Sequence, residues 1–274
     1  MKQILVTGFT LGLLFLASHV QAESNVLRMA TTTSTENSGL LKHLLPPFEA
    51  KCGCRVDVIS VGSGKAMKLG ENGDVDVVLV HSRADEDKFM AANHGVNRRD
   101  VMYNDFVIVG PKADPAAIRG MTDVLQGMKK IHESKSKFIS RGDESGTHKM
   151  ELGLWKAASI EANGPWYAST GQGMGEVLTM AAQMEGYTLT DRATYSAYRS
   201  KTGLEILVSG DPKLFNPYGV MAVNPQKYSA VNAAGATQFI EWVTSSEGQN
   251  RIADFKINGE QLFFPNAKQT AANK

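Results

Sequence analysis

Apolar residues follow two different spacings along the chain, and the change from one to the other marks the expected elements. Segments with alternating or continuous apolar residues predict strands, and segments with apolar residues three or four positions apart predict helices. Strands are expected at 26–31, 55–62, 75–81, 105–112, 137–141, 187–191, 204–209 and 218–224. Helices are expected at 38–45 (restarted after a Pro-Pro pair), 64–73, 84–95, 121–134, 146–158, 175–185 and 233–248. This regular succession of strands and helices predicts an α/β fold.

The segment "VDVVLVH" (75–81) is apolar almost throughout and does not alternate. Such a strand is typical of a sheet that is covered on both faces. Two series of strand–helix units follow one another without a flexible linker, a low-complexity tract or an internal repeat. We therefore expect two α/β lobes with a cleft between them.

The N-terminus has the pattern of a signal peptide. Lys2 precedes the apolar stretch "ILVTGFTLGLLFLA", and "VQA" ends at Ala22 with the small residue that a signal peptidase needs. The apolar stretch is shorter than the ~20 residues that a membrane-spanning helix requires. We expect cleavage after Ala22, which leaves 274 − 22 = 252 residues. The residue directly after the expected cut is not a cysteine, so a lipoprotein is not expected. The mature chain should be periplasmic.

The charge balance disfavours nucleic acid as a partner. The chain has 29 Lys and Arg against 28 Asp and Glu, and removing Lys2 leaves 28 of each. A neutral chain has no excess positive charge with which to displace counterions from nucleic acid. A small anion is still possible, because it needs only a local site.

The chain has two cysteines, Cys52 and Cys54, which are separated by one residue. Export favours their oxidation, but a disulfide across a single residue is geometrically marginal. The pattern predicts a structural pair at the edge of a strand and leaves its redox state open.

Hydroxyl-bearing residues and glycines gather at three places where a strand is followed by a helix. In open α/β sheets, ligands bind beyond the carboxyl ends of the strands. Helix N-termini in that position offer free N–H groups and partial positive charge. The three turns contribute Thr32, Thr33 and Ser34 from "ATTTSTENSGLL", Ser63 and Gly64 from "SVGSGKAMKL", and Arg141, Ser145, Gly146 and Thr147 from "SRGDESGTHKM". Many donors and few acceptors suit a compact, fully ionised oxyanion, although some of these hydroxyls could simply cap helices.

Two enzyme-like interpretations of the turns are weaker. "GSGK" is similar to an ATP-binding loop, but Ile59 stands where that loop has glycine and Ala66 where it has Ser or Thr. A hydrolase built on Ser145 and His148 lacks a "GxSxG" elbow, and both residues lie on one helical turn, from which the histidine could project to the surface. We therefore expect a non-enzymatic protein, with a hydrolase or transferase acting on a small anionic substrate as the alternative from another class. A third class, a sensor or adhesion module without a small ligand, does not account for the three turns.

A metal site is also disfavoured. Asp143, Glu144 and His148 could supply metal ligands, but carboxylates beside Arg141 are expected to pair with that arginine. We expect no metal cation and no cofactor.

Several long segments resemble the TupA-type tungstate-binding proteins of ABC importers. The segment "RGDESGTH" is similar to the anion-binding loop of periplasmic phosphate-binding proteins. The resemblance to the TupA type extends over nearly the whole mature chain. It rests on "ATTTSTENSGLL", "GDVDVVLVHS", "GVNRRDVMYNDFVIVGP", "SRGDESGTHKMELGLWKAA", "GQGMGEVLTMA", "YTLTDRATY" and "LFNPYGVMAVNP".

This resemblance implies a two-lobed, type II periplasmic binding protein fold with the ligand in the cleft between the lobes. One lobe would comprise 23–107 and 218–274, and the other 108–217, after the signal peptide 1–22. The resemblance also implies an ABC transporter permease and an ATPase at the inner membrane as partners. We expect a monomer. Carried over by position, the residues of the three turns named above become the oxyanion ligands.

The resemblance also bears on which anion is bound. Phosphate-binding relatives have an aspartate shortly after the strand that reads "VDVVLVHS" here, and it accepts the proton of hydrogen phosphate. His81 falls near that position, and histidine can donate. An unprotonated anion such as tungstate, molybdate or sulfate, which needs only donors, is therefore favoured over hydrogen phosphate. Tungstate is the expected ligand because of the family resemblance, with molybdate, which the sequence does not rank against it, and phosphate as alternatives. Two departures from the family are Lys65, which could alter the field at the site or point outward, and the "CGC" motif.

Overall fold

The computed structural model describes residues 26–267, so the predicted signal peptide and its cut after Ala22 lie outside the described residues. The strands are β1 (Val26–Thr32), β2 (Arg55–Val61), β3 (Val77–Val80), β4 (Gly95–Gly110), β5 (Phe138–Ser140), β6 (Tyr167–Ser169), β7 (Thr188–Asp191), β8 (Glu205–Val208), β9 (Phe215–Val223), β10 (Lys256–Ile257), β11 (Glu260–Gln261) and β12 (Phe264–Pro265). The helices are α1 (Thr33–Asn37), α2 (Leu40–Cys52), α3 (Ser63–Asn72), α4 (Arg83–Ala91), α5 (Val124–Glu133), α6 (Gly146–Ala157), α7 (Met174–Gln183), α8 (Arg192–Thr202), the short 3-10 helix η1 (Pro212–Leu214), α9 (Ala233–Thr244) and α10 (Ser246–Asp254). None of the helices in this part of the chain is long and apolar enough to cross a membrane.

The main sheet has the order β12-β4-β9-β3-β1-β2, and β7 and β8 pair with the far end of β4. β1 is parallel to both β2 and β3, whereas β9 is antiparallel to β3 and to β4. The mixed sheet with helices on its faces agrees with the predicted α/β class.

Buried side chains alternate between the two faces of each half of this sheet. In β3, Val77 and Leu79 pack into one core cluster and Val78 and Val80 into the cluster on the opposite face. The same alternation occurs in the second half of β4, where even and odd positions of 106–109 belong to different clusters. Because side chains in a strand point alternately to opposite faces, a strand buried on both sides must be apolar at every position. This explains the continuous apolar segment in the sequence.

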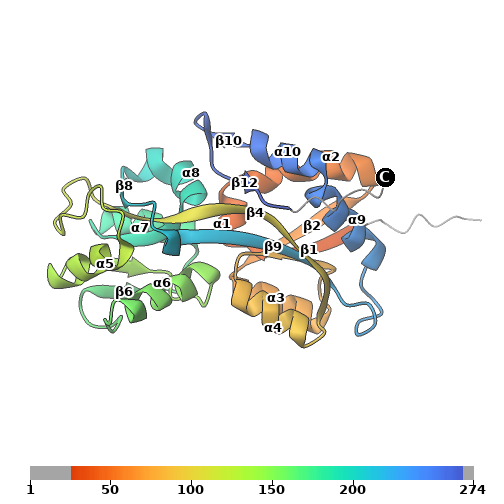
Figure 1. The fold of residues 1–274 in the computed structure, drawn as a ribbon, viewed down its shortest axis with the longest axis horizontal. Coiled ribbons are helices and arrows are strands. Elements are labelled where there is room, and N and C mark those ends of the chain that lie inside the picture. Colours follow the sequence, from red (N-terminus) through yellow and green to blue (C-terminus); the bar gives the residue numbers. More distant parts are fainter. Residues whose placement is uncertain (1–25, 268–274) are drawn as a thin grey trace, which may run out of the picture.

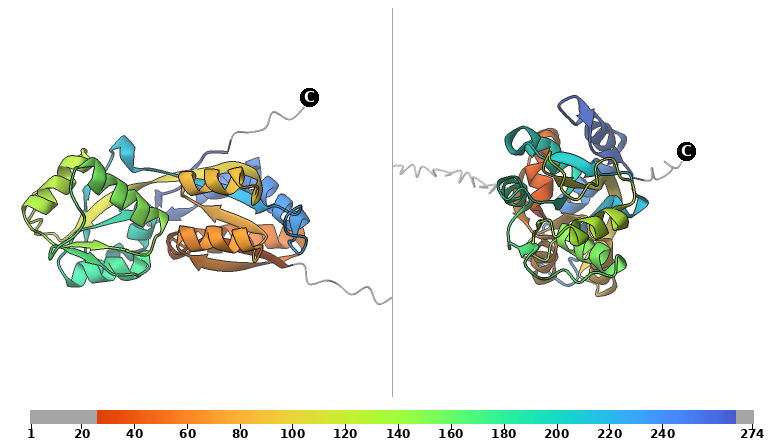
Figure 2. Two further views of the ribbon diagram at one scale, coloured as in Figure 1. Left: turned by 90° about the horizontal axis from the view of Figure 1, so that it is seen from below. Right: turned by 90° about the vertical axis from the view of Figure 1, so that its left-hand side faces the viewer.

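The long strand β4 serves both halves of the molecule. Its first part pairs with β9 over Gly95–Asp105, and its last part pairs with β7 and β8 over Phe106–Gly110. Figure 1 shows β4 and β9 running together across the middle, with α5, α6 and α7 at one end and α3, α4, α2 and α9 at the other. The left view in Figure 2 shows the same two groups of elements at the two ends of the molecule. The four core clusters thus form two pairs, one at each end, connected by β4 and β9.

The structure differs from the predicted elements at several places, and the short elements α1, β6, η1, β10, β11 and β12 were not predicted. β4 begins at Gly95, not at 105. The segment "GVNRRDVMYND" has too many polar residues to show the apolar pattern of a strand, but its backbone pairs with β9. The polar helix α8 was not predicted. The expected helix 233–248 is two helices, because Ser245 is extended (φ −73°, ψ 166°) and its side chain caps α10 by accepting from the N–H of Gly248.

Cys52 and Cys54 form a disulfide, with their Cα atoms 5.2 Å apart. The intervening Gly53 has φ +60°, a left-handed conformation that ends α2 and that glycine adopts without strain. The Cα separation lies within the ordinary range, so the geometric objection raised from the one-residue spacing was wrong for this turn.

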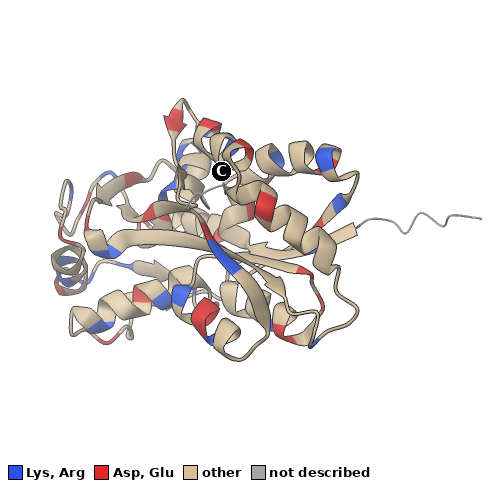
Figure 3. Cartoon of the chain, turned by 45° about the vertical axis from the view of Figure 1, so that its right-hand side comes forward, with Lys and Arg blue, Asp and Glu red and all other residues tan. Residues whose placement is uncertain are grey.

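Lys and Arg alternate with Asp and Glu over the elements seen in Figure 3. Blue and red segments are interspersed over the part of the molecule that this view shows. This agrees with the even balance of charges in the sequence.

Candidate functional site

The three predicted turns meet where the two halves of the molecule face each other. Thr33 begins α1, Ser63 begins α3 and Gly146 begins α6. Two hydrogen bonds join residues of different turns. The N–H of Gly146 donates to Oγ of Ser63 (3.1 Å), and Nη2 of Arg141 donates to Oγ1 of Thr33 (3.0 Å). Residues far apart in the sequence are therefore brought together at three helix N-termini.

Close backbone approach explains two of the glycines at this junction. A Cβ added to Gly146 would lie 3.0 Å from Oγ of Ser63, 3.1 Å from the carbonyl oxygen of His81 and 3.3 Å from Cε1 of His81. A Cβ added to Gly64 would lie 3.5 Å from the carbonyl oxygen of Glu144, which is ordinary contact. A side chain at 146 would therefore need Ser63 or His81 to shift by a few tenths of an ångström, whereas Gly64 is only in ordinary contact distance of the opposite turn. Lys65, next to it, is exposed.

Arg141 is the central cation of the junction. Its side chain is 2% exposed, and Nη2 also contacts Oδ2 of Asp143 at 2.6 Å. Burial by itself raises the pKa of Asp143, but the charge of Arg141 and hydrogen bonds from Ser145 and Arg141 outweigh it, so the pKa of Asp143 is lowered. Asp143 therefore stays ionised and holds one edge of the guanidinium. The expectation that this carboxylate pairs with Arg141 is confirmed.

Several buried donors at the junction have no protein partner. Within the described residues, Nε and Nη1 of Arg141 and Oγ1 of Thr147 are buried and make no hydrogen bond. Leaving a buried donor without a partner costs about 1–3 kcal/mol, and more for a charged group. Such a cluster of unpaired donors around a buried cation fits an anionic ligand that accepts from all of them.

The other predicted residues have roles that can be stated from their contacts. Thr32 caps α1, since its Oγ1 accepts from the N–H of Thr35, and Ser145 caps α6 by accepting from the N–H of His148. The capping interpretation thus applies to both. The ring of His148 is half-buried, and its Nδ1 accepts from the N–H of Glu144 at 3.1 Å. Our expectation that this histidine could project to the surface was wrong, because the ring folds back onto the turn that precedes its helix.

The sequence did not indicate the polar environment of His81. Nε2 of His81 lies 3.1 Å from Oγ of Ser34, and Nδ1 lies 3.0 Å from Oδ1 of Asn216. Nδ2 of Asn216 donates to Oδ1 of Asn104 (2.6 Å), and Nδ2 of Asn104 faces Oδ1 of Asp191 (3.4 Å). All five side chains are buried. Single polar residues on separate strands give no local pattern, which explains why they were missed.

His81 is neutral in this environment. Its pKa is lowered to about 4, mainly by burial and also by the nearby charge of Arg141, whereas the hydrogen bond with Asn216 acts in the opposite direction. His81 therefore adds no second cation beside Arg141 at neutral pH.

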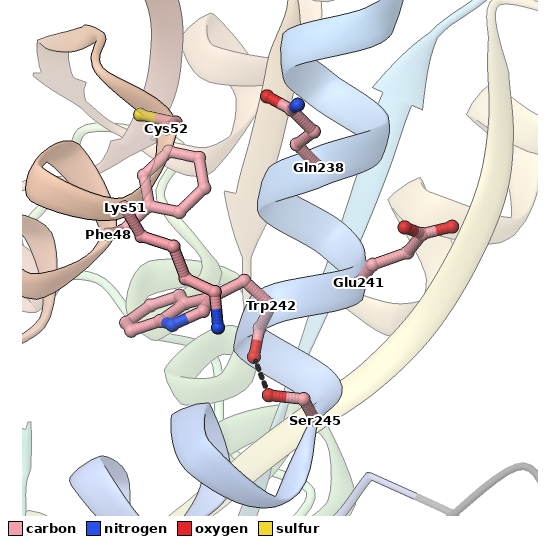
Figure 4. A pocket seen from close by; sticks show the side chains of 7 residues that line it. All are labelled: Phe48, Lys51, Cys52, Gln238, Glu241, Trp242 and Ser245. Carbon is pink, nitrogen blue, oxygen red and sulfur yellow. Dashed lines mark hydrogen bonds between the residues drawn. The ribbon is translucent and has the colours of Figure 1, made fainter.

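Two pockets away from the junction are less suited to an oxyanion. A pocket of about 400 Å³ between α2 and α9, shown in Figure 4, is lined by Phe48, Lys51, Cys52, Gln238, Glu241, Trp242 and Ser245. A second pocket, of about 320 Å³, contains three arginines, but Arg119 is paired with Glu205 and Arg192 with Asp105. Aromatic walls in the first pocket, and ion pairs that neutralise two of the three arginines in the second, leave the junction as the better candidate. Within the part of the chain that the structure describes, no three His, Cys, Asp or Glu side chains gather as a metal site would require.

Comparison with known proteins gives consistent relatives. Residues 19–247 match the family described as PBP superfamily domain. The chain is 48% identical over 251 residues to the "Tungstate-binding protein TupA" of Peptoclostridium acidaminophilum, covering 90% of this chain and 87% of that protein. The solved structure of the tungstate ABC transporter from Geobacter sulfurreducens is 57% identical, with a TM-score of 0.79, covering 84% of this chain and 98% of that one. The tungstate-binding protein TupA of Desulfovibrio alaskensis G20 is 49% identical, with a TM-score of 0.74, covering 89% and 99% of the two chains. The chain therefore belongs to the PBP superfamily and, within it, to the family of TupA-type tungstate-binding proteins.

Proposed function

We propose that this protein is a periplasmic receptor that binds tungstate at the junction of the three turns and delivers it to an ABC importer. The observation that carries the proposal is the cluster of buried donors around Arg141. Its Nε and Nη1 and the hydroxyl of Thr147 have no partner among the described residues. Relatives named for tungstate binding support the identity of the anion.

The site that we propose contains all nine predicted residues, with different roles. Arg141 supplies charge, and the remaining donors are hydroxyl and N–H groups at the helix starts. The list is Thr32, Thr33, Ser34, Ser63, Gly64, Arg141, Ser145, Gly146 and Thr147. Thr32 and Ser145 act chiefly by capping α1 and α6, which orients the N–H groups of those helices.

The two pairs of core clusters support two lobes. We propose that 23–107 with 218–274 forms one lobe and 108–217 the other, and that the anion lies between them. Partners of this receptor would be a permease and an ATPase, and the chain would act as a monomer. Delivery from the periplasm requires the signal peptide predicted at 1–22.

A hydrolase is the second candidate, because Ser34, His81 and Asn216 are arranged like a nucleophile, a base and the residue that orients the base. The electrostatics oppose it. A general base works best with a pKa near the working pH, and the pKa of His81 is lowered to about 4. Asn216 is neutral and cannot stabilise an imidazolium as a carboxylate would. A receptor is the better interpretation of the same contacts.

Calorimetric titration of the mature protein with tungstate, molybdate, sulfate and phosphate tests the proposal. We expect saturable one-to-one binding of tungstate, weaker binding of phosphate, and recovery of the anion unchanged. The same protein incubated with p-nitrophenyl phosphate and p-nitrophenyl sulfate should release no nitrophenol. Absence of tungstate binding would refute the receptor, and turnover that is lost in Ser34→Ala would establish the hydrolase.

A further inference from the structure

A chain of buried hydrogen bonds leads from the candidate anion site to a carboxylate in the other half of the molecule. It runs from Ser34 to His81 (3.1 Å), Asn216 (3.0 Å), Asn104 (2.6 Å) and Asp191 (3.4 Å). Asn104 and Asn216 face each other on the paired strands β4 and β9. We call these five residues the relay.

An ionised Asp191 fixes the direction of every hydrogen bond in the relay, because a carboxylate can only accept. The amide nitrogen of Asn104 must point towards Asp191, and its oxygen therefore accepts from Asn216. The oxygen of Asn216 then accepts from Nδ1–H of His81. Neutral His81 has a lone pair at Nε2, so the hydroxyl of Ser34 must donate to it.

With the hydrogen bonds in this direction, the hydroxyl of Ser34 cannot donate to the anion. Ser34 is fully buried, and its single hydroxyl hydrogen points to His81 while its oxygen lies 3.0 Å from Oγ1 of Thr32. A fully ionised oxyanion that binds beside Ser34, as the proposed function has it, then meets a lone pair of this hydroxyl and no hydrogen. Repulsion between this lone pair and the anion favours any change that reverses the relay.

The environment of Asp191 favours its protonation. The side chain is fully buried, and Oδ2 has no hydrogen-bond partner among the described residues. Burial raises the pKa of Asp191, although hydrogen bonds from Thr194 and the charge of Arg141 lower it in part. An unpartnered carboxylate oxygen in the interior is costly when it is charged.

The charged and titratable groups around Asp191 come from β4, α8 and β9 and from the turns after β3 and β5. On β4, Asp105 is paired with Arg192 of α8. On β9, the hydroxyl of Tyr218 lies 3.5 Å from Nδ2 of Asn216, and burial, followed by the charge of Asp191, raises its pKa. His81 follows β3, and Arg141 follows β5. Arg141 is the cation whose attraction for ionised Asp191 is shared with a bound dianion.

We propose that Asp191 is a positioning residue for the oxyanion: it takes up one proton when the anion binds, and the relay reverses so that the hydroxyl of Ser34 donates to the ligand. This rests on the proposed function. One proton from solvent binds Oδ1 of Asp191, which then donates to the oxygen of Asn104. Both amides exchange ends, and His81 loses the proton on Nδ1 and gains one on Nε2. The imidazole stays neutral, so the net uptake is one proton.

Reversal gives each donor and acceptor from Asn104 to Ser34 a partner, and Oδ2 of Asp191, which stays without one among the described residues, then belongs to a neutral carboxylic acid. Asn216 donates to Nδ1 of His81, and its oxygen can accept from the hydroxyl of Tyr218. Nε2–H of His81 donates to Oγ of Ser34. A proton placed on His81 in place of Asp191 would instead create a buried imidazolium near Arg141, which already disfavours it.

Calorimetry in buffers of different ionisation enthalpy tests proton uptake. For the wild type between pH 8 and 6, we expect uptake to rise towards one proton per tungstate as pH falls, with affinity increasing by up to tenfold per pH unit. The sign follows from linkage: a group whose pKa is higher in the bound state binds a proton on complex formation, so lower pH favours the complex. In Asp191→Asn, whose amide can donate without a proton, uptake should vanish and the affinity should be independent of pH. Asp123→Asn, at the cap of α5, should behave as the wild type.

Nitrogen NMR of ¹⁵N-histidine-labelled protein tests the direction of the relay without relying on affinity. Ligand-free wild type should carry the His81 proton on Nδ1, the tungstate complex should carry it on Nε2, and Asp191→Asn should carry it on Nε2 in both states. Uptake below one tenth of a proton throughout this range, unchanged uptake in Asp191→Asn, or an Nδ1–H tautomer in the complex would each overturn the proposal. If the wild type binds no tungstate, the receptor function fails, and the ligand-free tautomers of the two proteins still decide whether Asp191 directs the relay.

Discussion

Replacing Arg141 with alanine removes the fixed cation from the candidate site. The guanidinium is 2% exposed, donates through Nη2 to Thr33 and Asp143, and leaves Nε and Nη1 available to a ligand. A hydrogen bond to a charged group is worth about 1.5–3 kcal/mol, so two such bonds to a dianion contribute roughly 3–6 kcal/mol. Water that enters the space left by the side chain replaces part of this. Truncating one partner of a buried, hydrogen-bonded charge pair costs about 2–5 kcal/mol, and we expect a loss in that range.

This loss corresponds to an increase in the Kd for tungstate of about 30-fold to about 4,000-fold, since each 1.4 kcal/mol is a factor of ten. Isothermal titration calorimetry, with competition by a weaker anion if wild-type binding is too tight, measures it directly. Arg141→Lys should recover only part of the affinity, because an ammonium cannot reproduce the planar fork. Arg55→Ala is the control, since Arg55 is an exposed arginine paired with Asp57 on β2. A Kd for Arg141→Ala within threefold of the wild type would refute the assignment of Arg141 to the site.

Three further predictions concern packing, pH and ligand-induced stability. Gly146→Ala should weaken tungstate binding by about 1–3 kcal/mol, because the new methyl group meets Ser63 and His81. Gly153→Ala on the same helix is the control, since its Cβ would have open space around it. Equal tungstate affinities of the two variants, measured by calorimetry, would contradict this prediction. Burial raises the pKa of Glu151 to about 7, so the folded protein binds more protons than the unfolded chain, and stability should fall by about 3 kcal/mol as pH rises from 4.5 to 7. Glu151→Gln should flatten that dependence in urea unfolding and exposed Glu133→Gln should not, so a slope retained in Glu151→Gln would disprove the role of Glu151. Tungstate at 1,000 times its Kd should stabilise the fold by about 4.1 kcal/mol, seen as a higher Tm than with equal phosphate; a larger shift with phosphate would favour a phosphate receptor.

Elements with strong apolar patterns could be predicted from the sequence, and polar elements could not. The continuous apolar segment at 75–81 became the buried strand β3, and amphipathic segments became α3, α5 and α6. By contrast, α8 ("RATYSAYRSKT") has few apolar positions, and it is held by the Asp191 cap and by contacts with α7. Tertiary contacts stabilise such a helix, and they leave little trace in local composition.

The same distinction applies to the candidate site. Hydroxyls, glycines and an arginine at strand-to-helix turns form local patterns, so the meeting of Thr33 with Arg141 and of Ser63 with Gly146 could be anticipated. The hydrogen-bond directions at Ser34 could not. They depend on Asn104, Asn216 and Asp191, each a single polar residue in a different strand, and only strand pairing brings these residues together.

The shared strand β4 also has a consequence for how the chain can be divided. Close to the two proposed lobe boundaries, Asp105 of β4 and Phe215 of β9 are paired neighbours in the sheet, so the segment that forms the other half leaves and returns at adjacent positions. A segment whose ends lie side by side can be exchanged as a cassette, because the remaining chain needs only a short turn to close. The half built around β1, β2 and β3 could thus be joined to a differently shaped partner half by recombination at two adjacent positions. Arg141, Gly146 and Thr147 would be replaced together, and anion preference could then change in one step while the frame that contains Ser34 and Ser63 stays intact.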